Sequence, residues 1–178
     1  GAFGTLAVLT EVSLKVLPTP PAMLTAVMAC RDFDEAAALM RQILASPAEA
    51  TRLAFMPPAL AAAWPEASRF GLDDGGLVLG LEGPERGFDH RLALVAAATG
   101  NEAIEVERGA PSASDARGGT LAGAIERLEP LLDSTHGVDP AATALVRASV
   151  PPSSAPAVAG ALAPYPTLLD CAGHWLLA

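Results

Sequence analysis

The sequence predicts an α+β fold, and three observations support this prediction. Short apolar or alternating runs, typical of strands, are interspersed with two stretches of helical periodicity between residues 23 and 108. Prolines and glycines separate these runs as turns do. Hydrophobic residues make up 51% and charged residues 17% of the 178 positions, which is typical of a globular chain and not of a disordered one.

The first predicted element is a half-buried strand over Glu11 to Leu17. Its even positions from Val12 to Val16 are apolar, and its odd positions from Glu11 to Lys15 are polar. Prolines at positions 18, 20 and 21 then form a stiff linker, because proline cannot continue a strand ladder. We therefore divide the chain into residues 1–21, the tail end of one domain with its linker, and residues 22–178, a second domain. The abrupt, apolar ends of the chain predict a fragment of a longer protein, with the second domain cut short at its C-terminus.

The body of the chain is predicted to run β-α-β-β-α-β. A strand over Met23–Cys30 leads into a helix that Asp32 caps, with Glu35 at the capping-box position. Four further elements complete the unit: a strand over 51–56, a strand over 77–81 after the hairpin turn Asp73-Asp74-Gly75-Gly76, a helix marked by Phe88, Leu92 and Val95 that stops at Gly100, and a strand over 103–107. This order is that of the ferredoxin-like split βαβ unit, in which two helices pack on one face of an antiparallel sheet.

Extra α-β units are expected after this body. A loop of small residues over 109–119 precedes a predicted helix over 121–132 and a predicted strand over 142–150. A short helix over 156–162 and a final strand over 167–177 complete the prediction.

The acidic composition argues against two classes of partner. The formal net charge is −9, and Lys15 is the only lysine. Binding of nucleic acid or of an anionic membrane surface needs clustered lysine and arginine. No stretch of about 20 apolar residues and no signal peptide is visible. We therefore expect a cytoplasmic protein with no nucleic-acid partner and no membrane insertion.

Side chains that could bind a metal are scattered. Cys30 and Cys171 are expected to be buried free thiols. Neither they nor the three histidines show a spacing typical of zinc or iron ligands, so no metal site is expected; the histidines are His90, His136 and His174.

Three glutamates are expected to form a solvated strand face: Glu102, Glu105 and Glu107.

The sharpest motif is the N-terminal run Gly1-Ala2-Phe3-Gly4-Thr5-Leu6-Ala7-Val8-Leu9-Thr10-Glu11. Its glycines allow the backbone to approach a ligand closely, and N–H groups of such a turn can hold a phosphate. A Gly-x-x-Gly-Thr run alone would equally fit a tight turn before a strand.

The longer run GAFGTLAVLTEVSLKVLPTP resembles the end of the FAD-binding domain in the vanillyl-alcohol-oxidase and p-cresol-methylhydroxylase flavoprotein family. Within that family, residues 11–18 look closest to the FAD-binding subunit of multi-subunit glycolate oxidase, and residues 144–151 and 168–173 are similar to strands of its cap domain.

The resemblance implies a cofactor, a reaction and partners. Five residues would lie against FAD, largely through backbone groups near the pyrophosphate and the adenine: Gly1, Ala2, Gly4, Thr5 and Val8. Ala2 and Ala7 replace the serine and glycine usual in the family, so this chain lacks one possible hydroxyl contact and the close packing that a glycine allows at position 7.

The body would be the cap domain that shapes the substrate side of the flavin. The parent would be an FAD-dependent oxidoreductase that oxidises a short 2-hydroxy acid such as glycolate. Its partners would be a second flavin subunit and an iron–sulfur subunit, which could also hold it at the inner membrane. The fragment alone is expected to be inactive, and no catalytic residue is nominated.

Arg147 is the candidate for the substrate side. It lies in an otherwise apolar predicted strand, and a guanidinium pairs well with a carboxylate. An edge-strand arginine in solvent or in a structural ion pair is the alternative. Two other functions also remain open for the whole chain: a free-standing ferredoxin-like regulatory or ligand-binding domain, and a module that only docks other subunits.

Overall fold

The computed structural model describes residues 10–15, 18–64, 66–111, 121, 147–148, 150–151, 153–162, 168–170 and 175–177. Its elements in chain order are β1 (Ala22–Met28), α1 (Phe33–Ala45), β2 (Arg52–Met56), α2 (Pro58–Ala63), the 3-10 helix η1 (Ala67–Phe70), β3 (Gly76–Gly83), the 3-10 helix η2 (Glu85–Gly87), α3 (Phe88–Thr99), β4 (Ile104–Gly109), β5 (Arg147–Ala148), α6 (Ala155–Ala161), β6 (Leu168–Asp170) and β7 (Trp175–Leu177).

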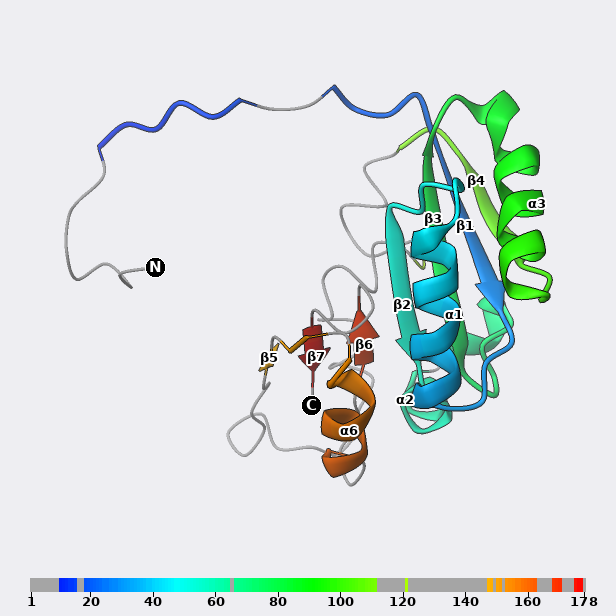
Figure 1. Ribbon diagram of the computed structural model, residues 1–178. Helices are drawn as coiled ribbons and strands as arrows, with labels where there is room; N and C mark the ends of the chain where they lie inside the picture. The colour runs from blue at the N-terminus through cyan, green and yellow to red at the C-terminus, as the bar shows by residue number, and fades with distance from the viewer. Residues whose placement is uncertain are drawn as a thin grey trace.

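The predicted α+β class is confirmed. Four antiparallel strands lie in the order β2-β3-β1-β4, with β1 and β3 in the centre. The short strands β6, β7 and β5 continue the sheet beyond β2. In Figure 1, β4 forms one edge of the sheet, beside β1.

Helices α1 and α3 cover one face of the sheet. Figure 1 shows α1 in front of the sheet and α3 to its right, on the side of β1 and β4. Alternate strand residues point toward them and are buried, as in Leu24, Ala26 and Met28 of β1. Leu39, Met40 and Ile43 of α1 and Val95 of α3 meet these residues, and α6 adds Ala155 and Ala159 to the same core.

The signals that begin and end the helices are local, and the structure confirms them. Asp32 accepts a hydrogen bond from the backbone N–H of Glu35, at 2.8 Å. The Glu35 carboxylate in turn accepts from the backbone N–H of Arg31, also at 2.8 Å, one residue earlier than the usual capping box. This bond, and then the Arg31 side chain, lower the pKa of Glu35. At the end of α3, Gly100 takes the left-handed conformation (φ 70°) that glycine adopts easily.

The second face of the sheet is covered at one end by a segment that the sequence did not predict. Residues 57–75 connect β2 to β3 through α2 and η1, so the predicted hairpin at Asp73–Gly76 is wrong. The turn itself is present: the N–H of Gly75 donates to the carbonyl of Leu72, at 2.9 Å. Stacked rings of Trp64 and Phe70, 5.5 Å apart, lie over Val78 and other apolar residues of this face.

Two predicted strands differ from the structure. Residues Thr10 to Lys15 form no strand, and the side chains of Val12 and Leu14 are 59% and 79% exposed. An alternating pattern becomes a strand only where another strand supplies hydrogen bonds, and no strand in the described part of the chain pairs with these residues. The predicted single strand over 167–177 is two strands, since β6 and β7 pair with each other antiparallel.

In the part of the chain that the structure describes, no helix is long and apolar enough to cross a membrane.

Candidate functional site

The predicted cofactor residues lie outside the described part of the chain. These are Gly1, Ala2, Gly4, Thr5 and Val8. Arg147 is the first residue of β5 and pairs with Leu177 of β7, but only its backbone placement is described. Their roles therefore stay predictions.

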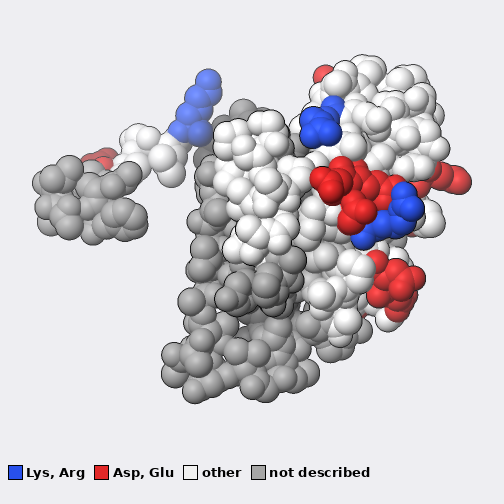
Figure 2. Space-filling model, turned by 60° about the horizontal axis from the view of Figure 1, so that its bottom comes forward, with Lys and Arg blue, Asp and Glu red and all other residues white. Residues whose placement is uncertain are grey.

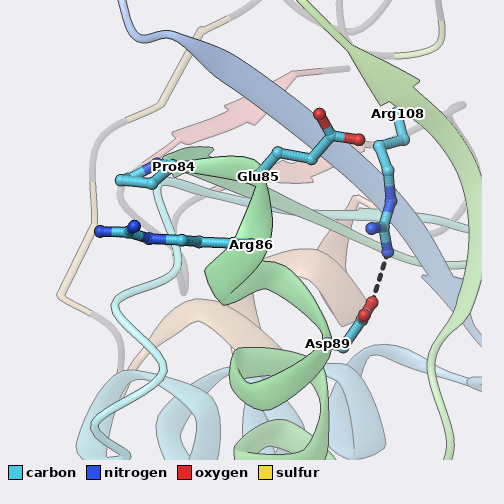
Figure 3. Close-up of a pocket in the computed structure, with 5 residues that line it drawn as sticks. All are labelled: Pro84, Glu85, Arg86, Asp89 and Arg108. Carbon is cyan, nitrogen blue, oxygen red and sulfur yellow. Dashed lines mark hydrogen bonds and ion pairs between the residues drawn. The ribbon is translucent and has the colours of Figure 1, made fainter.

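One open pocket lies where β3 passes into α3, lined by Pro84, Glu85, Arg86, Asp89 and Arg108. Gly83 ends β3 with φ 133°, a conformation that favours glycine, and the single turn η2 follows. This turn places Glu85 and Arg86 beside the first turn of α3. Arg108 reaches the same place from β4 (Figure 3).

Ion pairs within the protein hold Arg108. Its guanidinium lies 2.6 Å from a carboxylate oxygen of Asp89 and 2.6 Å from one of Glu105. These hydrogen bonds, first that with Glu105 and then that with Asp89, raise the pKa of Arg108. The same guanidinium lies 5.9 Å from the ring centre of Phe88, within the range of a cation–π contact. Arg108 thus links β4 to the start of α3.

Arg86 is the second cation of this pocket. Its residue is exposed, and Figure 3 shows its side chain on the opposite side of η2 from Arg108. Because Arg86 and Arg108 point apart, they do not converge on one anion in this arrangement. The pocket as it stands is therefore a charged surface hollow.

A row of polar residues crosses the second face of the sheet. Arg52 of β2 stands opposite Gly80 of β3, Gly80 opposite Thr25 of β1, and Thr25 opposite Glu107 of β4. A Cβ on Gly80 would lie 2.8 Å from the Cβ and 3.2 Å from Nη1 of Arg52, so the arginine side chain lies across this glycine. Thr25 is 4% exposed, and among the described residues it is the one buried polar side chain. The row places opposite charges at its two ends.

Neither charged end of this row is free. The Glu107 carboxylate accepts from the backbone N–H of Leu121, at 3.1 and 3.3 Å, and both Arg52 and Glu107 make further interactions. Sequence reasoning missed the row, although one signal was present. Gly80 stands between apolar residues inside the run GLVLGLEG, and a glycine in the interior of a strand is typical of a close approach by a neighbouring group.

The three glutamates predicted to share a solvated strand face do not do so. Glu102 is exposed but precedes β4. A bulge between Thr25 and Ala26 sets Glu107 opposite Thr25 and Glu105 opposite Ala26. Successive residues of β1 point to opposite faces, so Glu107 and Glu105 do as well. Glu105 therefore meets Arg108 near α3, whereas Glu107 belongs to the polar row.

The described cysteine and histidine side chains do not gather. Cys30 is a buried free thiol, as predicted, and its pKa is raised to about 11, first by burial and then by the charge of Glu35. His90 is exposed on α3. Among the described residues, no three groups of the kind that ligate metals lie close enough together to hold an ion. Cys171, His136 and His174 lie outside the described residues.

The surface shown in Figure 2 carries mixed charge. Acidic and basic side chains lie next to one another on this face, with uncharged surface around them. The described residues on this face form no basic stripe of the kind that follows a phosphate backbone.

No protein-family model and no curated protein matches the sequence.

Proposed function

We propose that this chain is the cap portion of the FAD-binding subunit of a glycolate-oxidase-type flavoenzyme. The observation that carries the proposal is the run from Gly1 to Pro20, which resembles the end of the family's FAD-binding domain in the order of its glycines and of its Thr-Glu-Val-Ser-Leu-Lys continuation. In this proposal, residues 1–21 complete that domain and link it to the cap.

The arrangement of the described elements supports a cap of ferredoxin-like type. The order β1-α1-β2-β3-α3-β4 is the one such a unit requires, and the strand order β2-β3-β1-β4 is compatible with it. We propose that α2 and η1 are an insertion between the second and third strands of that unit. The insertion seals one end of the second face with the Trp64 and Phe70 rings.

The exposed tail also supports the proposal. The tail, residues Thr10 to Lys15, projects from the start of β1 away from the sheet (Figure 1). Leaving the Val12 and Leu14 side chains in water forgoes about 1.5–3 kcal/mol of burial energy for each. Such a segment gains stability when a neighbouring sheet supplies a partner strand, which is the role that the FAD-binding domain would have.

The residues of this chain would hold the two reactants. Backbone groups of Gly1, Ala2, Gly4, Thr5 and Val8 would lie against FAD, and glycine allows the close approach that a pyrophosphate needs. The flavin would supply the redox chemistry by accepting a hydride from the 2-hydroxy acid. Arg147 would hold the carboxylate of that acid, because a guanidinium binds a carboxylate through two parallel hydrogen bonds.

A second flavin subunit and an iron–sulfur subunit would carry the electrons away. We propose a cytoplasmic location, or one at the inner membrane through these partners.

The decisive experiment is the visible spectrum of the protein expressed from the whole gene together with its genomic neighbours. We expect an oxidised-flavin band at about 450 nm that bleaches when glycolate or D-lactate is added under argon. A colourless protein would overturn the proposal. The 178-residue chain alone is expected to bind no FAD measurably, since the run at its N-terminus forms only one edge of the site.

A matched pair of glycine variants tests the N-terminal run within that protein. Gly4→Val should lower the flavin content, because the side chain would block the close approach of the backbone. Gly109→Val is the control, since a Cβ at Gly109, at the end of β4, meets no atom within 4 Å. Equal flavin content in the two variants would remove the proposed role of Gly4.

A binding or assembly module without catalysis is the second candidate. Ile104 favours it, because this residue is 69% exposed on β4 at the edge of the sheet. An exposed apolar side chain on the edge strand of the described sheet suits contact with another protein. A colourless protein that copurifies with the neighbouring subunits would support this candidate over the flavoenzyme.

A further inference from the structure

We draw no further inference here: the strongest candidate, the open pocket between η2, the first turn of α3 and the end of β4, carries nothing because Asp89 and Glu105 already hold Arg108 and nothing in the structure shows what would occupy it.

Discussion

At the scale of single residues, Gly80 is a position where the sheet leaves no room for a side chain. It is buried in β3, and the side chain of Arg52 occupies the space that a Cβ would need. We predict that Gly80→Ala lowers the free energy of unfolding by about 1–3 kcal/mol, because the new Cβ would collide with the Cβ of Arg52, which the backbone of β2 fixes, and β2 and β3 would have to shift apart at this pair. Urea denaturation followed by circular dichroism measures this change.

Gly109→Ala is the control for that substitution. Gly109 lies in the edge strand β4, has no positive φ, and leaves open space where a Cβ would stand. Its stability should change by no more than about 0.5 kcal/mol. If Gly80→Ala were as stable as Gly109→Ala, Arg52 would not be confined over the glycine.

Cys30 offers a second test at this scale. Burial and the nearby Glu35 carboxylate hold its pKa at about 11, so very little thiolate is present at pH 8. In a Cys171→Ser background, we predict that Cys30 reacts with a thiol reagent at least on the order of a hundredfold more slowly in the folded protein than in urea. Equal rates would show that the thiol is not buried.

The same pKa predicts how stability changes with pH. A folded-state pKa above the unfolded value means that the folded protein holds the proton more tightly. The stability that Cys30 contributes is therefore complete below the pKa of the unfolded thiol, and it is lost as the pH rises from there toward about 11. Replacement of Cys30 by alanine should make the pH dependence in this window shallower.

At the scale of elements, Arg91 joins three parts of the fold. Its guanidinium donates to the backbone carbonyls of Ala48 at 2.7 Å, Glu49 at 2.6 Å and Glu82 at 2.7 Å. It thereby ties α3 to the loop after α1 and to the end of β3. We predict that Arg91→Met costs about 2–4 kcal/mol of stability, since three carbonyls lose a charged donor. Thermal or urea unfolding provides the measurement.

Arg41→Met is the matched control for this clamp. Arg41 is exposed on α1, and the same substitution there removes the same charge without breaking a hydrogen bond among those described. Its effect should stay within about 0.5 kcal/mol. A similar loss in both variants would mean that net charge, and not the clamp, determines the effect.

At the scale of the whole molecule, the tail and the α+β unit should separate on proteolysis. Lys15 is the only lysine and lies exposed in the tail, so a lysine-specific protease has one site. We predict rapid cleavage after Lys15, and a product of residues 16–178 that keeps the circular dichroism and the midpoint of thermal unfolding of the uncut chain. Lys15→Arg should resist the protease.

This cleavage also bears on the proposed function. In the protein expressed from the whole gene, the tail would be a strand of the FAD-binding domain, and cleavage after Lys15 should be much slower than in the 178-residue chain. Equally fast cleavage in both would contradict the proposed place of the tail. The flavin spectrum remains an independent readout, so the two results can be distinguished.

The sequence predicted the body of the fold well, whereas the sites that it nominated stay predictions. Strands 51–56, 77–81 and 103–107 correspond to β2, β3 and β4, each with an altered boundary. The apolar runs of β2 and β3 reflect burial directly, whereas β4 is exposed or half-buried along its length. The link between β2 and β3 was missed because short apolar segments such as PALAAA show no clear period. Gly1 to Val8 and Arg147 were nominated from a resemblance and remain predictions. The Arg108 pocket joins residues 84 to 108 and has no local signal.

The sequence by itself determined the features that depend on a few neighbouring residues. Asp32 begins α1 and Gly100 ends α3 because a cap or a left-handed glycine acts on the backbone within one turn. Only the tertiary structure decided which strands pair, where β4 bulges, and which face each glutamate takes. Those outcomes depend on hydrogen bonds and packing between residues far apart in the chain. The tail shows the same dependence on distant residues. It has the alternating pattern of a strand, but no strand of the described chain pairs with it, so it forms none.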